Sequence, residues 1–126
     1  MSHITKLGRI IVPVADQDAA IAFYTGKLGF SLAADVPFGQ GERWVEVAPA
    51  QGGVTLALVP PRGEQRPGVK TGIALESSDV RADHAELKAC GVDVDDDLIG
   101  GDGTVPLLFF FRDTDGNQLM VVQRQA

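Results

Sequence analysis

The sequence predicts an α+β fold built from two tandem βαβββ modules. The first observation is order, because patterns typical of a strand, a helix and three further strands occur twice along the 126 residues. The second is a shift by 63 positions, which carries Asp16 onto Asp79 and Gly53 onto Gly116. The third is a polar turn at residues 113–117 between two apolar runs, which is typical of a β-hairpin. A chain of this length with 44% hydrophobic residues suffices for one domain, 1–126, with a core.

The first module is expected at about residues 6–60. Residues 7–14 are rich in β-branched side chains and predict a strand. Asp16 follows as the N-cap of a helix that Gly29 ends. The apolar face of this helix is predicted to contain Ile21, Tyr24 and Leu28. Three more strands are expected at residues 30–36, 43–48 and 54–59, with loops at 37–41 and 49–53.

A linker at about residues 61–69 precedes the second module, and its Pro and Gly content excludes regular structure there. The second module, at about residues 70–124, begins with a strand at 71–76 and a helix capped by Asp79. The apolar face of this helix is predicted to contain Val80, His84 and Leu87. A short strand at residues 92–94, a loop at 95–103 and a hairpin of 106–111 with 119–123 are expected to follow. One helix cannot cover both faces of a sheet, so each module is expected to leave its inner face open toward a cleft.

Composition narrows the possible partners. The formal net charge of −6 and the isoelectric point near 4.7 argue against nucleic acid, because phosphate binding needs clustered Lys and Arg. The lone Cys90 excludes an internal disulfide and a thiolate metal cluster. The start of the chain lacks the apolar core of a signal peptide, and no apolar run reaches membrane-spanning length. We therefore expect a cytoplasmic protein without a membrane partner.

Two segments carry a resemblance to a known family: residues 14–30, which end in FYTGKLGF, and DTDGN at residues 113–117. Together with the repeated βαβββ order, they resemble the vicinal oxygen chelate superfamily, which includes glyoxalase I, bleomycin-binding proteins and extradiol dioxygenases. The resemblance covers nearly the whole chain. It implies open concave sheets that form a cleft, helices outside, and a homodimer. It does not specify an activity, because one fold hosts many functions.

Metal-dependent members of that superfamily carry His, Gln or Glu at four inward positions. The motif spacing maps these positions onto Arg9, Ala57, Gly72 and Met120. None of these residues offers an oxygen or imidazole ligand, and the Arg9 charge would repel a cation. We therefore predict no metal ion and no cofactor. The two histidines do not rebuild a site, because His3 lies near the terminus and His84 is expected to pack on the outer layer.

Two acids remain as polar candidates for the cleft. Alternation places Glu76 on the same strand face as Gly72, and Glu46 on the same face as Trp44. Both acids are expected to form a polar floor opposite Arg9. The alternative is that they form an ion pair or an exposed rim charge.

An apolar wall is the second expectation for the cleft. The 63-residue shift relates the core residues Val45 and Val47 to Leu108 and Phe110. Phe109 and Phe111 would then face the cleft together with Trp44, as aromatic side chains do in small-molecule sites. The alternative is that three consecutive Phe residues fill both faces of a buried strand.

Two functions follow from these candidates. One is a metal-independent protein that binds a small molecule, with a cationic aromatic ligand drawn by the acidic charge and held on Trp44 or Phe109. The other is an enzyme of the lyase, isomerase or dioxygenase-like kind with a displaced metal site or acid–base chemistry. In that case Glu76 or Glu46 is the base, and Arg9 stabilises an oxyanion.

Overall fold

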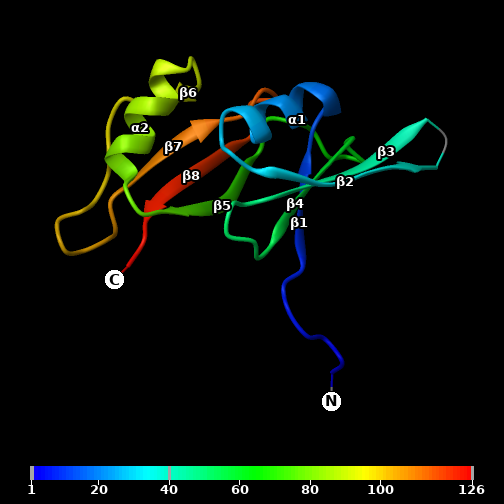
Figure 1. Ribbon diagram of the computed structural model, residues 1–126, viewed down its shortest axis with the longest axis horizontal. Helices are drawn as coiled ribbons and strands as arrows, with labels where there is room; N and C mark the ends of the chain where they lie inside the picture. Colours follow the sequence, from blue (N-terminus) through cyan, green and yellow to red (C-terminus); the bar gives the residue numbers. More distant parts are fainter. Residues whose placement is uncertain (1, 40, 126) are drawn as a thin grey trace. The chain divides into compact units, whose positions relative to one another are not determined.

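The computed structural model describes residues 2–39 and 41–125, and its elements follow the order βαβββ twice (Figure 1). The chain divides into two modules, Met1–Pro67 and Gly68–Ala126. The elements of the first are β1 (Arg9–Pro13), α1 (Gln17–Gly26), β2 (Ser31–Phe38), β3 (Glu42–Ala48) and β4 (Thr55–Val59). Those of the second are β5 (Lys70–Ser77), α2 (Val80–Ala89), β6 (Asp93–Val94), β7 (Leu108–Arg112) and β8 (Gln118–Gln123). The predicted α+β class with two βαβββ modules is confirmed.

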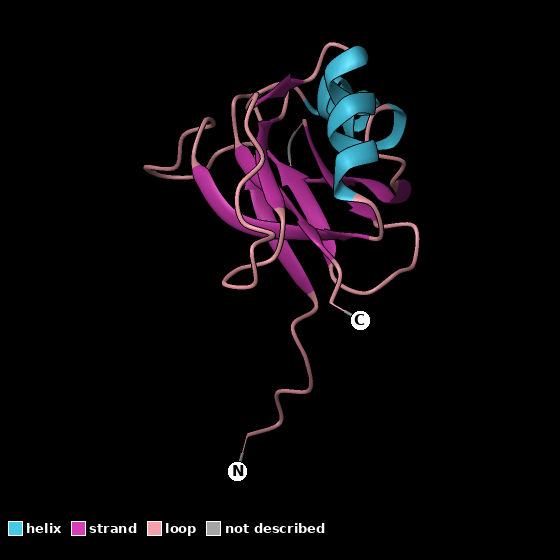
Figure 2. Ribbon diagram, turned by 90° about the vertical axis from the view of Figure 1, so that its left-hand side faces the viewer, coloured by secondary structure: helices cyan, strands magenta, loops and turns pink. Residues whose placement is uncertain are grey.

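Each module contains one four-stranded sheet, drawn in magenta in Figure 2. The strand orders are β1-β4-β3-β2 and β5-β8-β7-β6. The first strand of each module pairs in parallel with its last strand, and the other pairs are antiparallel. The first and last strands of a module are therefore direct neighbours, so residues far apart in the sequence share one sheet face.

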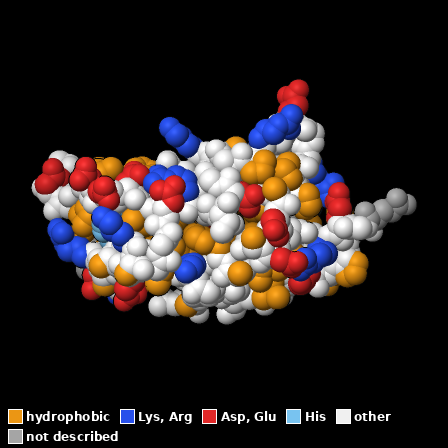
Figure 3. Space-filling view, turned by 90° about the horizontal axis from the view of Figure 1, so that it is seen from above, with side chains coloured by type: hydrophobic (Ala, Val, Ile, Leu, Met, Phe, Trp, Pro, Cys, Tyr) orange, Lys and Arg blue, Asp and Glu red, His pale blue; other side chains and the backbone are white. Residues whose placement is uncertain are grey.

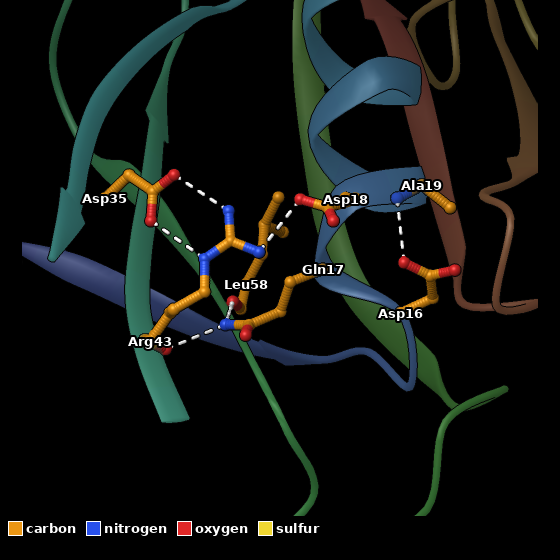
Figure 4. Close-up of polar contacts among 7 residues, drawn as sticks. All are labelled: Asp16, Gln17, Asp18, Ala19, Asp35, Arg43 and Leu58. Atoms are coloured by element: carbon orange, nitrogen blue, oxygen red, sulfur yellow. Dashed lines mark hydrogen bonds and ion pairs between the residues drawn. The ribbon is translucent and has the colours of Figure 1, made fainter. Parts of the chain in front are cut away.

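The helix α1 begins and ends where its sequence signals predict. The Asp16 carboxylate accepts a hydrogen bond from the Ala19 amide over 3.0 Å, which satisfies one of the free amides of the first turn (Figure 4). At the other end, Gly29 adopts a φ of 76°, and the Phe30 amide donates to the Tyr24 carbonyl over 3.0 Å. Glycine takes this left-handed conformation without a Cβ penalty, so it suits a helix stop.

Polar contacts tie the first turn of α1 to one face of its sheet (Figure 4). The Gln17 side chain donates to the backbone carbonyls of Arg43 and Leu58 over 2.8 and 2.9 Å. The Arg43 guanidinium donates to both carboxylate oxygens of Asp35 and also to Asp18 on the helix. These contacts assign the α1 side of the first sheet, and the opposite side is called the open face below.

The second helix is anchored by a different contact. Asp79 caps it by accepting from the Ala82 amide over 3.1 Å, as predicted. The Gln123 side chain of β8 then accepts from the Val80 amide over 3.1 Å, and Val80 itself is buried. Neither helix of the described chain combines the length and apolarity that crossing a membrane requires.

The core of each module lies between its sheet and its helix. In the first module the fully buried side chains include Tyr24 of α1 with Val45 and Val47 of β3, which confirms the prediction that these two valines are core. In the second module they include Phe109 and Phe111 of β7, with Leu119 of β8 almost fully buried. Burial of such side chains is the main favourable contribution to the stability of each module.

The strand β2 runs further than the sequence predicts. Residues 37–41 were expected to form a loop, yet Pro37 pairs with Arg43 and Phe38 pairs with Glu42. β2 is the edge strand of its sheet, where the missing amide of Pro37 costs no ladder hydrogen bond. The hairpin of β2 and β3 consequently extends well beyond α1 (Figure 1).

The turn at residues 113–117 contains two buried polar side chains, Asp113 and Asn117. Asn117 is 0% exposed, and its side-chain oxygen accepts hydrogen bonds from the amides of Gly68 and Val69 over 2.9 and 3.2 Å. The Asn117 amide donates to Asp113, whose carboxylate also accepts from the Asn117 side-chain nitrogen. The turn therefore joins the β7–β8 hairpin to the segment that enters β5.

Candidate functional site

The open face of the first sheet carries four of the residues that the sequence assigned to a ligand site: Arg9, Trp44, Glu46 and Ala57. Since side chains alternate along a strand, burial of Val45 and Val47 under α1 places Trp44 and Glu46 on the open face. Glu46 pairs directly with Ala57 of β4, so Ala57 lies on this face too. Ala57 is fully buried, and its small methyl group leaves room for the longer side chains around it.

Glu46 is the polar centre of this face. One of its carboxylate oxygens, Oε2, accepts from Arg9 Nε over 3.0 Å and from Trp44 Nε1 over 2.6 Å. The other, Oε1, accepts from the Thr55 hydroxyl over 2.7 Å. These donors come from β1, β3 and β4, so one carboxylate connects three strands. Glu46 forms an ion pair with Arg9, which is the alternative to the predicted polar floor of two acids.

The surroundings of Glu46 keep it ionised. Hydrogen bonds from Trp44 and Thr55, followed by the charge and hydrogen bond of Arg9, lower the pKa of this carboxyl below its ordinary value, although burial opposes them. The Glu46 side chain is only 12% exposed. A carboxylate with a lowered pKa holds a proton weakly. Glu46 is therefore a structural anion and a poor general base.

An aromatic pair lies on the same face near the hairpin of β2 and β3. The rings of Phe38 and Trp44 meet edge to face with centroids 5.8 Å apart. The Arg62 guanidinium lies over the Phe38 ring at 5.3 Å, and it donates to Glu42 over 2.8 Å. An arginine from the segment after β4 thus lies over one face of the Phe38 ring.

Apolar side chains remain exposed on the open face. Ile11 of β1 pairs with Ala57, and Val36 of β2 pairs with Trp44, so both share the open face. Ile11, Val36 and Phe38 are 42%, 51% and 48% exposed. Exposed apolar side chains, a tryptophan and a fixed polar cluster therefore share one sheet face.

Two residues of this face, Phe38 and Arg62, were not predicted from the sequence. Phe38 was expected in the loop of residues 37–41, and Arg62 in the linker of residues 61–69. The alternation of Val36 with Phe38 and of Glu42 with Trp44 would have identified the aromatic pair, since both strands present every second residue to one side. No local pattern marks Arg62, because its contact with Phe38 depends on how the chain folds back after β4.

In the second module the equivalent face has a different composition. Met120 of β8 pairs with Phe110 of β7 and with Ala74 of β5, so these three share the face opposite α2. Glu76 is exposed on the same face, because it pairs with Val122 two residues beyond Met120. Gly72 lies where the pairing of β5 with β8 is interrupted, between Lys70 and Ala74, and its φ is 74°. Such an irregularity re-aims a strand locally.

The assignment of Phe109 and Phe111 to the cleft is wrong. Both side chains are fully buried on the α2 side of the sheet, and the Phe109 ring lies edge to face with His84 of α2 at 4.9 Å. Phe110 is the half-buried phenylalanine on the opposite face.

The physical reason is the length of the hairpin turn. Residues 48–55 connect the last β3–β4 pair, Val47 with Leu56, whereas residues 112–118 connect Phe111 with Leu119. The second connection is one residue shorter, so the strand before it is displaced by one position relative to the 63-residue repeat. Because side chains alternate, a displacement of one residue exchanges the two faces of β7.

His84 is a packing residue, as expected. Its Nε2–H donates to the Asp95 carbonyl over 2.7 Å, and its ring covers Phe109. Within residues 2–39 and 41–125, no group of three or more His, Cys, Asp or Glu side chains is placed to hold a metal ion.

Basic and acidic side chains lie beside one another on the surface seen in Figure 3. Pairs such as Lys88 with Asp96 and Arg112 with Asp93 have nitrogen–oxygen distances of 2.8 and 2.9 Å. Charges in water are screened over a Debye length of about 8 Å at physiological salt. Local pairs, more than the net charge of −6, therefore set the potential at a given site.

Comparison with known proteins gives consistent matches over nearly the whole chain. The family model described as Glyoxalase/Bleomycin resistance protein/Dioxygenase superfamily matches residues 6–121. The uncharacterized protein YetH of Bacillus subtilis is 32% identical over 123 residues, which cover 94% of this chain and 98% of YetH.

Solved structures agree with this match. The crystal structure of TnmS3, an antibiotic binding protein from Streptomyces sp. CB03234, is 35% identical with a TM-score of 0.86 and covers 99% of this chain and 100% of TnmS3. A superfamily member from Sphaerobacter thermophilus is 27% identical with a TM-score of 0.88, over 96% of this chain and 98% of that chain.

Proposed function

Because this chain belongs to the glyoxalase/bleomycin resistance protein/dioxygenase superfamily, we propose that it binds a small organic molecule on the open face of its first sheet without a metal ion. The observation that carries the proposal is the position of Trp44. Its indole is fixed by Glu46 on one side and contacts Phe38 on the other, among exposed apolar side chains. A rigid aromatic surface of this kind binds a flat ligand at low entropic cost.

The donor chemistry supports binding without a metal. The four positions that the family resemblance maps to metal ligands carry a guanidinium, a methyl group, a hydrogen atom and a thioether, in Arg9, Ala57, Gly72 and Met120. Divalent cations of the Mg²⁺, Mn²⁺, Fe²⁺ and Zn²⁺ kind prefer carboxylate, carbonyl or imidazole ligands. These residues do not fit such a cation, and the Arg9 charge opposes one.

A relative supports the ligand class. TnmS3, which is 35% identical to this chain, is an antibiotic binding protein. The proposal transfers only the class, a small organic molecule, to this chain. We also propose that the protein acts in the cytoplasm and that it forms a homodimer. Sedimentation of the purified protein tests the dimer.

The alternative is an enzyme that uses acid–base chemistry. Glu46 does not favour it, because its lowered pKa and three hydrogen-bond donors make it a poor base. Glu76 is exposed and remains the acid that an enzymatic role would need. A Glu76→Gln variant separates the two functions. If the protein is an enzyme that uses Glu76 as its base, the variant loses turnover; if the protein only binds its ligand, the variant binds as well as the wild type.

Tryptophan fluorescence provides the test, since Trp44 is the only tryptophan in the chain. A panel of polycyclic aromatic antibiotics is titrated against the protein, with calorimetry in parallel. We expect at least one compound to quench Trp44 and bind with a micromolar or lower dissociation constant, equally well after treatment with EDTA.

Two controls make this result specific. A Trp44→Leu variant should weaken calorimetric binding at least tenfold, whereas Phe110→Leu in the second module should not. Absence of binding across the panel, together with stoichiometric metal in the purified protein, would refute the proposal.

A further inference from the structure

The hydrogen-bond inventory of the open face distinguishes between ligand charges. Glu46 is the acid at its centre, and both of its oxygens already accept hydrogen bonds, from Arg9, Trp44 and Thr55. Its charge is balanced by the ion pair with Arg9 at 3.0 Å. A cationic ligand would have to compete with these donors. Glu46 therefore offers little to a cation.

Arg9 has the opposite property. Among the described residues it donates a hydrogen bond only through Nε, to Glu46. Its side chain is 55% exposed. The guanidinium also carries two terminal nitrogens with N–H groups, and these are the pair that bind a carboxylate in a bidentate manner. On the open face, the terminal N–H donors of Arg9 are thus available to a ligand, whereas the Glu46 oxygens already accept hydrogen bonds.

Arg9 is also held close to the aromatic surface. Its Nε and the indole nitrogen of Trp44 both lie within 3.0 Å of the same Glu46 oxygen. A ring that stacks on Trp44 therefore places a substituent within reach of the Arg9 terminal nitrogens. Glu46 acts as a positioning residue for both side chains.

The second arginine of this face is less available. Arg62 lies over Phe38, and its terminal nitrogen Nη2 donates to Glu42 over 2.8 Å, so one of its two terminal nitrogens is already engaged. The Arg62 side chain is nevertheless 53% exposed. Arg62 therefore adds a second positive group near the aromatic pair, and the nearby acid Glu42 is paired with it.

Resting on the proposed function, we propose that the ligand of this face is a flat aromatic molecule with an anionic oxygen group, a carboxylate or phenolate, which the terminal nitrogens of Arg9 receive. The net charge of −6 would attract a cation at long range. Screening over a Debye length of about 8 Å weakens that attraction, whereas a charge-assisted contact acts at hydrogen-bond distance. The local geometry therefore opposes the expectation of a cationic ligand that the composition suggests.

Three matched probes test the inference: 2-naphthoate, the neutral 2-naphthylmethanol and the cationic 2-naphthylmethylammonium. They share one ring system and differ mainly in charge. Calorimetry at neutral pH should rank 2-naphthoate at least tenfold tighter than the alcohol, with the ammonium probe weakest. In Arg9→Met, 2-naphthoate should bind no more tightly than the alcohol. Arg9→Lys, which keeps the charge and loses the planar pair of donors, should lie between the two.

The control is Arg81→Met, an exposed arginine of α2, which should leave all three affinities unchanged. Circular dichroism of each variant checks that the fold persists. If the ammonium probe binds as tightly as 2-naphthoate, or if Arg9→Met leaves 2-naphthoate binding intact, the ligand charge is misassigned while the small-molecule function stands. If none of the three probes binds while an antibiotic of the panel does, the ligand assignment fails and the small-molecule function stands.

Discussion

Trp44 donates its indole N–H to Oε2 of Glu46 over 2.6 Å, and the two residues stand two positions apart on one strand. The contact fixes the tryptophan ring on the open face of the first sheet and gives the carboxylate one of its three donors. Aromatic surface and polar anchor are therefore one structural unit. The ionisation of Glu46 should therefore affect the free energy of unfolding as well as ligand binding.

Replacement of Glu46 by Gln should change how stability depends on pH. The folded-state pKa of Glu46 is lowered, so its stabilising effect is fully present above the unfolded-state pKa of about 4.3 and is lost as pH falls through the lower folded-state value. As the pH falls below about 5, the free energy of unfolding of the wild type should thus fall more steeply than that of Glu46→Gln. Urea unfolding followed by Trp44 fluorescence measures both slopes.

At neutral pH the same variant should lose about 1–2 kcal/mol, because neutral hydrogen bonds replace charge-assisted ones. Glu64→Gln, an exposed acid of the segment after β4, serves as the control. Identical pH slopes in the wild type and Glu46→Gln would show that the carboxylate is not held by these donors.

Truncation of neighbouring phenylalanines should distinguish the two faces of β7. Phe109 is fully buried against His84, so Phe109→Ala should lower the free energy of unfolding by about 3–5 kcal/mol. Phe110 is half-buried on the other face, and Phe110→Ala should cost less than about 2 kcal/mol. Thermal and urea unfolding measure the difference. The reverse ranking would restore the face assignment that the 63-residue repeat predicts.

Loss of the Asn117 side chain should destabilise the second module. Its oxygen accepts from the Gly68 and Val69 amides in a fully buried position, and Asn117→Ala leaves those donors without this partner. We expect a loss of about 2–4 kcal/mol. The exposed Thr114 lies in the same turn, and Thr114→Ala should change stability by less than about 0.5 kcal/mol. A loss in Asn117→Ala as small as that in Thr114→Ala would contradict the stabilising role of these buried hydrogen bonds.

Two glycines of the loop before β7 form a matched pair. Gly100 and Gly103 both adopt positive φ, 78° and 96°, so alanine incurs a conformational cost of about 1–2 kcal/mol at each. A Cβ at Gly100 would also lie 2.5 Å from the Pro106 carbonyl oxygen, whereas one at Gly103 meets nothing within 4 Å. Gly100→Ala should therefore be more destabilising by at least about 1 kcal/mol. Equal melting temperatures for the two variants would contradict the close approach.

Local signals in the sequence identified much of the fold. Asp16 and Asp79 cap their helices as predicted, because an N-cap depends on a side chain and an amide three residues away. Strand alternation correctly placed Val45 and Val47 in the core and Glu46 beside Trp44. These inferences succeeded because each one concerns residues within a single element.

Failures occurred where distant geometry decides. The side of the sheet on which Phe109 lies depends on the length of the turn after β7. A constant shift of 63 residues does not account for a change in that length. The contact of Arg62 with Phe38 depends on the path of the chain after β4. The number of hydrogen bonds that Glu46 accepts likewise requires three strands to be in register. Tertiary arrangement, not local preference, determines such contacts.

The shorter hairpin turn of the second module also explains how a duplicated protein can diverge. Removal of a single residue from a turn reverses the orientation of every side chain in the preceding strand, without any substitution in that strand. One half of the chain then presents an acid, Glu46, where the other presents a benzyl ring, Phe110. A small deletion can thus assign different chemistry to two halves that began alike, and the length of this turn is a practical handle for redesigning which residues a ligand meets.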